Sequence, residues 1–150
     1  MHPNPIYRRA DRQQNLDFAA QVGFGMLALS QADQPPLLSH VPFVIEDDRV
    51  LLHLVRSNPI VRQLKTPQMV TLAVQGPHGY VSPDWYGIAD QVPTWNYVAV
   101  HLTGQARLLP QAQLMDVLTR LSDRFEADLA PKPIWKLDKV AAEARARMMR

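Results

Sequence analysis

The chain has 150 residues, which suits one domain with a buried core, and 47% of them are hydrophobic, as in an ordinary globular protein. It contains no cysteine, which excludes disulfides and thiolate metal sites and favours a reducing, cytoplasmic compartment. Its net charge of +2 and pI near 9.2 fit a bound phosphate or weak nucleic-acid affinity. We expect neither a signal peptide nor a membrane span, because no apolar segment is long enough.

The first half of the chain predicts helices and strands bounded by clear local signals. Asp11 is a favourable N-cap for a helix over residues 12–22, and Gly23 is a typical stop. Asn58 and Pro59 suit the cap and first position of a second, short helix. Three strands are predicted at residues 24–30, 37–45 and 50–56, and an acidic turn joins the last two as a hairpin.

The second half predicts three more strands, at residues 69–75, 79–82 and 96–109, with an irregular excursion at 83–93. A helix begins at Pro110 and carries the apolar stripe Leu114, Val117, Leu118, Leu121 and Phe125. A basic helical end follows at residues 138–150. Six short strands with flanking helices predict a single α+β domain, residues 1–150, built on a mainly antiparallel small barrel.

Residues 75–101 hold two of the three Trp and three of the four Tyr. Because buried Trp, Tyr and His need hydrogen-bond partners, this density suggests a planar, partly polar ligand. Trp95 and Tyr97 alternate with Asn96, so both rings lie on one side of the strand, and the Asn96 amide can read a heteroaromatic edge. The alternative is an aromatic plug at a barrel end or a subunit interface.

A second candidate site lies where the predicted third strand meets the short helix. Arg56 offers a forked cationic donor, Ser57 a hydroxyl, and Asn58 begins a helix whose first N–H groups are unpaired. Together these groups predict a cradle for a phosphate monoester. The alternative is a capped surface helix with a solvated arginine.

Three other sequence patterns are weaker evidence for a functional site. Residues 23–28 match a relaxed dinucleotide fingerprint, but they follow a helix and open a strand, which is the wrong context. Ser82, His78 and Asp84 sit in one turn, which favours turn chemistry over a hydrolytic triad. A metal site is disfavoured because no second ligand stands at ligand spacing beside the histidines of the predicted barrel, which are His40, His53, His78 and His101.

From about residue 7 to 150 the chain resembles the PaiB-type FMN-binding proteins. The resemblance is carried by residues 40–43 (HVPF), 53–59 (HLVRSNP), 75–86 (QGPHGYVSPDWY) and 92–101 (VPTWNYVAVH). It implies a split barrel, a homodimer with FMN at the subunit seam, and a role as negative transcriptional regulator. Members of that family usually continue into a further strand, whereas this sequence ends at Arg150.

The resemblance also implies residue roles. Arg56, Ser57 and Asn58 are expected near the FMN phosphate. His40 and His53 are expected to face the flavin or the ribityl chain. The third group, expected to reach the flavin from the same chain or from the partner chain, consists of Trp95, Asn96 and Tyr97.

Three functions remain open at this point. The first is an FMN-binding regulator that contacts DNA through the basic C-terminal cluster Lys136, Lys139, Arg145, Arg147 and Arg150. The second is a flavin-dependent oxidoreductase acting on a small molecule, with His78 or His101 as a conceivable proton donor. The third is a dimerising module that binds no flavin.

Overall fold

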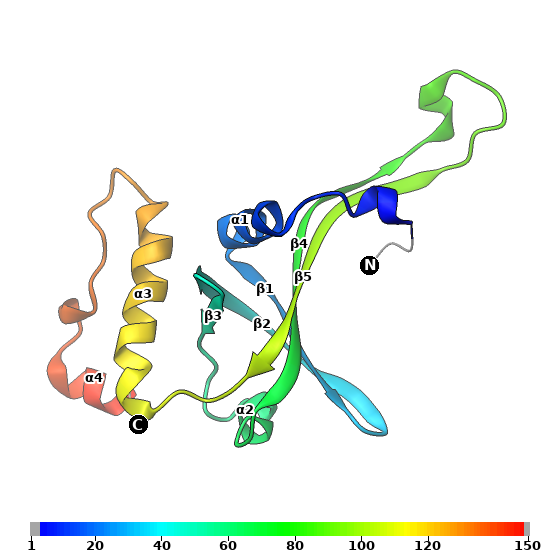
Figure 1. Ribbon diagram of the computed structural model, residues 1–150. Helices are drawn as coiled ribbons and strands as arrows, with labels where there is room; N and C mark the ends of the chain where they lie inside the picture. Colours follow the sequence, from blue (N-terminus) through cyan, green and yellow to red (C-terminus); the bar gives the residue numbers. More distant parts are fainter. Residues whose placement is uncertain (1–3, 149–150) are drawn as a thin grey trace.

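The computed structural model describes residues 4–148, which form one five-stranded antiparallel sheet with flanking helices (Figure 1). The strand order is β3-β2-β1-β4-β5. The strands are β1 (Phe24–Gln31), β2 (Gln34–Glu46), β3 (Arg49–Leu52), β4 (Gln68–Val81) and β5 (Thr94–Ala106). The α-helices are α1 (Arg12–Val22), α2 (Pro59–Gln63), α3 (Leu114–Ala127) and α4 (Ala142–Met148). The expected α+β class with a mainly antiparallel sheet is confirmed.

Local signals fix the helix ends that the sequence predicts. Asp11 accepts a hydrogen bond from the Gln14 N–H, and the Gln14 side chain accepts one from the Asp11 N–H, which completes a capping box at the start of α1. Gly23 ends the helix in the left-handed conformation, with φ of 61°. Asn58 caps α2 as expected, and Pro59 is its first residue.

The prediction of six strands is wrong, because residues 69–75 and 79–82 belong to one strand, β4. This strand pairs with β5 from Gln68↔Ala106 to Val81↔Thr94, with a register shift between Gln75 and His78. Pro77 lies in this shift, where the missing N–H of proline costs no ladder hydrogen bond. The bulge therefore lets β4 continue through a stretch whose sequence predicts the end of one strand and the start of another.

Several element boundaries also differ from the expected ones. The strand expected over residues 50–56 ends at Leu52, and the one expected over 96–109 is β5. The strand expected over 37–45 extends in both directions to become β2. The basic end is a short 3₁₀ turn, Leu137–Lys139, followed by α4, and residues 149–150 lie outside the described part of the chain.

The sheet has two faces of different character. The core face carries Leu27 of β1, Leu72 of β4 and Val100 of β5, all at most 7% exposed. Helices α1 and α2 add Ala19, Ile60 and Leu64 to the same core, so they cover this face. The remaining buried members of the core cluster are Leu29, Val41, Phe43 and Val74.

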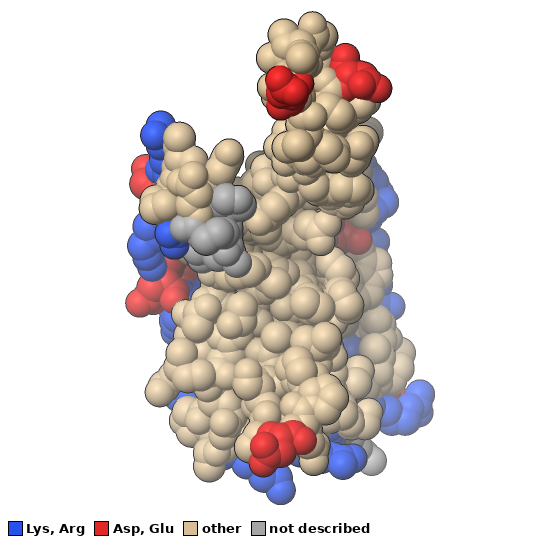
Figure 2. All heavy atoms as spheres, turned by 90° about the vertical axis from the view of Figure 1, so that its right-hand side faces the viewer, with Lys and Arg blue, Asp and Glu red and all other residues tan. Residues whose placement is uncertain are grey.

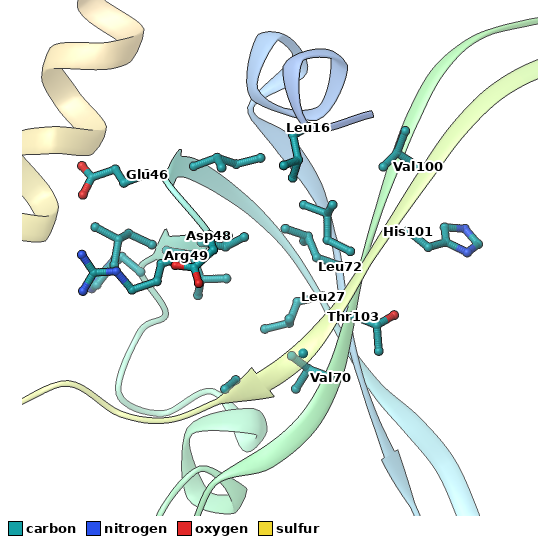
Figure 3. A pocket seen from close by; sticks show the side chains of 18 of the residues that line it. Leu16, Leu27, Glu46, Asp48, Arg49, Val70, Leu72, Val100, His101 and Thr103 are labelled. Carbon is teal, nitrogen blue, oxygen red and sulfur yellow. The ribbon is translucent and has the colours of Figure 1, made fainter. Parts of the chain in front are cut away.

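The opposite face, called the outer face below, carries the alternate residues of β2, β1, β4 and β5. Cross-strand pairing places His40, Met26, Ala73 and His101 in one row across it. His101 points away from the core side in Figure 3, whereas Val100 points toward it, as the alternation along β5 predicts. Figure 2 looks onto the side of the molecule away from α3 and shows a broad area without Lys, Arg, Asp or Glu.

Helix α3 is attached to the rest of the fold at its middle and its C-terminal end. Arg120 donates to Glu46, at the end of β2, over 2.5 Å. Arg124 reaches the carbonyl oxygens of Ala20 and Gln21 at the end of α1, at 3.5 and 3.4 Å. Of the predicted apolar stripe, Val117 and Leu121 are buried.

No helix within residues 4–148 is long and apolar enough to span a membrane.

Gly25 is the position in β1 where a side chain is excluded by a neighbouring backbone. A Cβ there would lie 2.8 Å from the carbonyl oxygen of Ala73 in β4. We expect Gly25→Ala to destabilise the fold by roughly 1–3 kcal/mol, because β1 and β4 must shift apart. Urea unfolding measures this. Gly104→Ala is the matched control, since nothing lies within 4 Å of its added Cβ. Equal midpoints for both variants would contradict the packing of β1 against β4.

Candidate FMN site

A groove with a volume of about 1930 Å³ opens between the core face of the sheet and the wall formed by β3 and α3 (Figure 3). Leu27, Val70, Leu72 and Val100 point into it from the sheet. Glu46, Asp48 and Arg49 lie on the opposite wall, near α3. The groove is therefore an apolar cleft with a charged rim, the general form of a site for a ring-bearing ligand.

The rim carries more arginines than carboxylates. The charged lining residues are Arg8, Arg12, Arg49, Arg56, Arg107 and Arg120 against Glu46, Asp48 and Asp116. Ion pairs with Glu46 and Asp116 raise the pKa of Arg120 above its ordinary value, and this arginine ties α3 to the sheet. The excess of positive charge in a partly enclosed cleft favours an anionic ligand.

The loop that carries Arg56 is held in place by Asn58. The Asn58 Oδ1 accepts from the Ile60 N–H at 2.9 Å, and the Asn58 Nδ2 donates to the Ser39 Oγ of β2 at 3.1 Å. The Asn58 side chain thus fixes the loop between two elements. Arg56 and Ser57 remain exposed, and the Arg56 Nη2 donates to Gln111 Oε1 at 3.3 Å.

The residues present fit a phosphate-bearing ring compound. Arg56 lines the groove and presents a planar fork of donors, and the adjacent Ser57 adds a hydroxyl. Helix α2 has only five residues, so its dipole adds little, and side-chain donors must supply the contact. His53, three residues earlier, also lines the groove.

The other predicted cluster lies on an extension of β4 and β5, called the arm below (residues 78–97). Trp95 faces Tyr80 across the strands, and Tyr97 faces His78. The Trp95 Nε1 donates to the His78 Nδ1 at 3.3 Å, and the two rings stack with centroids 5.8 Å apart. Trp95 and Tyr97 are 55% and 53% exposed, so these rings form an open platform. The role of His78 depends on the β4–β5 register, which sequence reasoning did not identify.

Trp95, Asn96 and Tyr97 line the same large groove as Arg56, but the structure places the two clusters at opposite ends of it. From Trp95 to Ala106 the strand advances eleven residues, which is roughly 36 Å along its length. Arg56 contacts Gln111, which lies beyond that strand end. A single mononucleotide is too short to contact both clusters of the same chain. Strand alternation also turns Asn96 to the face opposite Trp95 and Tyr97.

His40 lies apart from the groove. It sits on the outer face, exposed, with its ring stacked on Phe24 at a centroid distance of 6.4 Å. Ser82 shows the expected turn chemistry, since its Oγ accepts from the Asp84 N–H at 3.3 Å and caps a 3₁₀ turn. Within residues 4–148 no group of three or more His, Asp or Glu side chains is placed to hold a metal ion.

Comparison with known proteins identifies the family. A family model described as "Putative FMN-binding domain" matches residues 1–150. The chain belongs to this FMN-binding family. The match confirms the family and the cofactor, FMN, that the sequence resemblance implies.

Two relatives and one solved structure are similar to this FMN-binding chain. Protease synthase and sporulation protein PAI 2 of Bacillus subtilis is 29% identical over 139 residues, covering 90% of this chain and 66% of that protein. The uncharacterized protein YKL070W of Saccharomyces cerevisiae is 32% identical over 117 residues, 69% of each chain. A FAD and heme binding protein from Mycobacterium smegmatis has a TM-score of 0.61 at 19% identity, covering 85% of this chain and 60% of the other, and it shows the shared fold.

The two hydrogen bonds of Asn58 give a testable difference between its possible replacements. Asn58→Ala removes both the cap of α2 and the bond to Ser39, so we expect a loss of roughly 1–2 kcal/mol in unfolding free energy. Asn58→Asp keeps an acceptor for the Ile60 N–H and should lose less. Chemical denaturation of both variants measures the difference. Two equally unstable variants would show that the cap is not the stabilising contact.

Proposed function

We propose that this protein binds FMN non-covalently as a cytoplasmic homodimer, with the phosphate held by Arg56 and Ser57. The observation that carries the proposal is the apolar groove of about 1930 Å³ with Arg56 on its positive rim. A phosphate dianion there meets a bidentate cationic donor, and the flavin ring meets aliphatic side chains. When bound, FMN supplies redox chemistry that the protein's own side chains lack.

Three further residues predicted to bind the cofactor, His53, Asn58 and His40, relate differently to a phosphate held at Arg56. His53 lies on the same loop as Arg56 and lines the groove, which supports contact with the ribityl chain. Asn58 acts by fixing the loop through its bonds to Ile60 and Ser39. His40 lies on the outer face, so it meets a flavin only where a second copy brings one against that face.

We place the aromatic platform of the arm in the flavin site of the partner chain. Trp95 and Tyr97 lie near the start of β5, whereas the Arg56 of the same chain contacts Gln111 beyond the end of that strand. A two-fold axis that reverses the strand direction brings the arm of one copy beside the Arg56 end of the other. Each FMN is then held by a phosphate site from one chain and by the Trp95 and Tyr97 rings of its partner, whereas Asn96 faces the other side of that strand.

For the cellular role we propose a transcriptional regulator, on the support of the similarity to PAI 2, whose name links it to protease synthesis and sporulation. Contact with DNA is assigned to α4, which carries Arg145 and Arg147. Lys136, also expected in that cluster, is instead paired with Asp123 at 2.7 Å. The basic surface is therefore smaller than the sequence suggests.

The size of the groove favours a second candidate, a flavin-dependent oxidoreductase. The groove is several times larger than one flavin mononucleotide, and its rim has further arginines, Arg8 and Arg12, away from Arg56. An anionic small molecule can therefore bind in the same groove as FMN. Anaerobic mixing with NADH or NADPH separates the candidates. Bleaching of the flavin absorbance supports an oxidoreductase, whereas an unreactive flavin supports a regulator.

The phosphate placement predicts the effect of removing Arg56. Arg56→Ala should raise the dissociation constant for FMN about 10- to 150-fold, because one charge-assisted contact contributes roughly 1.5–3 kcal/mol. Fluorescence quenching of FMN on titration with protein measures this constant. Arg9→Ala is the control, because Arg9 is exposed and does not line the groove. An unchanged constant in Arg56→Ala would refute the placement.

The two-chain site predicts complementation between damaged chains. Arg56→Ala and Trp95→Ala homodimers should each bind FMN weakly. A purified mixed dimer has one site with both defects and one intact site, so it should bind one FMN per dimer with wild-type affinity. If each site lay within one chain, every site of the mixed dimer would carry a defect and no tight binding would appear. Differential tags and co-expression provide the mixed dimer.

The DNA assignment predicts a binding signal with strong salt dependence. Contacts from α4 to phosphates release counterions, so a gel-shift signal with the protein's own promoter DNA should weaken steeply between about 50 and 200 mM salt. Arg145→Ala/Arg147→Ala should reduce it further. A signal that is insensitive to both salt and these substitutions would exclude α4 as the DNA contact.

A further inference from the structure

We propose that the groove has a second binding site, beside the N-terminal segment, which takes a phosphate-bearing ring compound while FMN occupies the Arg56 end. Its polar contacts are Arg8, Arg12 and the Asn96 amide, which all line the groove. Arg8 follows a 3₁₀ turn, Pro5–Tyr7, and Arg12 is the first residue of α1. The inference rests on the FMN placement proposed above and adds a second ligand to the same groove.

FMN bound at Arg56 leaves the other end of the groove open. All 13 residues of β5 line the groove, and along the strand they extend over roughly 40 Å. Asn96 lies near the start of this length, whereas Arg56 contacts Gln111 beyond its end. One mononucleotide is too short to fill that distance. A phosphate held at Arg56 therefore leaves room for another molecule at Asn96.

The charges that line the groove exceed those that one FMN neutralises. Six arginines and three carboxylates line it, which gives a net charge of +3. A phosphate monoester carries about −1.5 to −2 near neutral pH, so the groove remains positive with FMN bound. Among the described lining residues of the N-terminal segment and β5, the charged ones are Arg8 and Arg12, with no carboxylate. This end of the groove therefore favours a second anion.

Local hydrogen bonds fix the segment that carries the two arginines. The Arg8 N–H donates to the Pro5 carbonyl oxygen at 2.9 Å. The Asn15 side chain donates to the carbonyl oxygens of Ala10 and Asp11, at 3.2 and 2.8 Å. In Figure 1 this segment runs from α1 toward the arm. A backbone held in this way lowers the entropy that is lost when the arginines bind a ligand.

The position of Arg12 adds a separate reason for an anion at this place. Arg12 begins α1, at the positive end of the helix dipole, where a cation is disfavoured and an anion is stabilised. Within residues 4–148 no Asp or Glu forms an ion pair with its guanidinium. The preceding Asp11 does not line the groove, and its carboxylate accepts from the Gln14 N–H at 2.8 Å. A bound phosphate would offset the repulsion between the guanidinium and the start of the helix.

An apolar surface for a ring adjoins these donors. Phe18 of α1 and Val98 of β5 lie together, since a Cβ built on Gly76 would be 2.5 Å from the Phe18 ring and 3.2 Å from the Val98 Cβ. Val98 is 45% exposed, and strand alternation places it on the same side of β5 as Asn96. Phe18 and Val98 both line the groove. A ring can therefore pack on them while its phosphate is bound by the arginines.

Calorimetric titration of FMN-saturated protein with adenosine 5′-monophosphate and with adenosine tests this site, because the two probes differ only in the phosphate. We expect the wild type to bind the monophosphate at least about tenfold more tightly, through charge-assisted contacts. Arg8→Ala/Arg12→Ala should lose most of this preference. Arg9→Ala is the matched control, because Arg9 is exposed in the same segment and does not line the groove. Equal affinities of the wild type for both probes overturn the site.

A change at Asn96 tests the amide contact. Asn96→Asp adds a negative charge on the groove side of β5, so it should weaken the binding of the monophosphate by about tenfold and leave that of adenosine nearly unchanged. Equal losses for the two probes would show a change of shape in place of a lost phosphate contact and would overturn the role of Asn96.

The FMN affinity of Arg8→Ala/Arg12→Ala separates this inference from the placement of FMN. Loss of monophosphate binding while FMN still binds tightly supports two distinct sites. A large loss of FMN affinity in this variant would put the FMN phosphate at Arg8 and Arg12, and it would overturn both proposals. A wild type that binds no FMN overturns the FMN placement, whereas a monophosphate preference that still depends on Arg8 and Arg12 would leave the second site standing.

Discussion

The long pairing of β4 with β5 is the constraint on which the rest of this structure depends. It runs from Gln68↔Ala106 to Val81↔Thr94 and continues past the bulge between Gln75 and His78. Its lower half supplies Leu72, Val74 and Val100 to the core, and its upper half forms the arm. Because β5 is the last strand of the sheet, its far edge and much of its length remain exposed in one chain.

This ladder separates the two groups of side chains that suit a flavin. The loop after β3 holds Arg56 at one end of the groove, and the arm holds Trp95 and Tyr97 at the other end. The separation is a property of strand geometry, since each residue advances the chain by about 3.3 Å. In the homodimer that we propose, a site that uses both groups is assembled from two chains.

Sequence reasoning succeeded where the determining interactions are local. The caps at Asp11 and Asn58 and the stop at Gly23 depend on hydrogen bonds and backbone conformations within a few residues, and each was predicted correctly. The alternation of Val100 and His101 across β5 was equally predictable, because the period of a strand is fixed. The stripe of α3 indicated Val117 and Leu121, which are buried.

Features set by long-range pairing could not be read from the sequence. The bulge at Pro77 exists because β5 continues on the other side, and the proline alone indicates a break. The bond from Trp95 to His78 depends on register, and the end of β3 at Leu52 depends on where β2 stops pairing. For the site, the motif around Arg56 identified a plausible phosphate contact, but the distribution of His40, Trp95 and Tyr97 over another face required the fold.

The central claim is that this groove recognises FMN through its phosphate at Arg56. The most direct measurement compares the dissociation constants of FMN and riboflavin, which differ only in the phosphate, for the wild type and for Arg56→Ala. We predict that the wild type binds FMN at least about tenfold more tightly than riboflavin, and that most of this preference is lost in the variant. Equal affinities for the two flavins in the wild type would contradict the account.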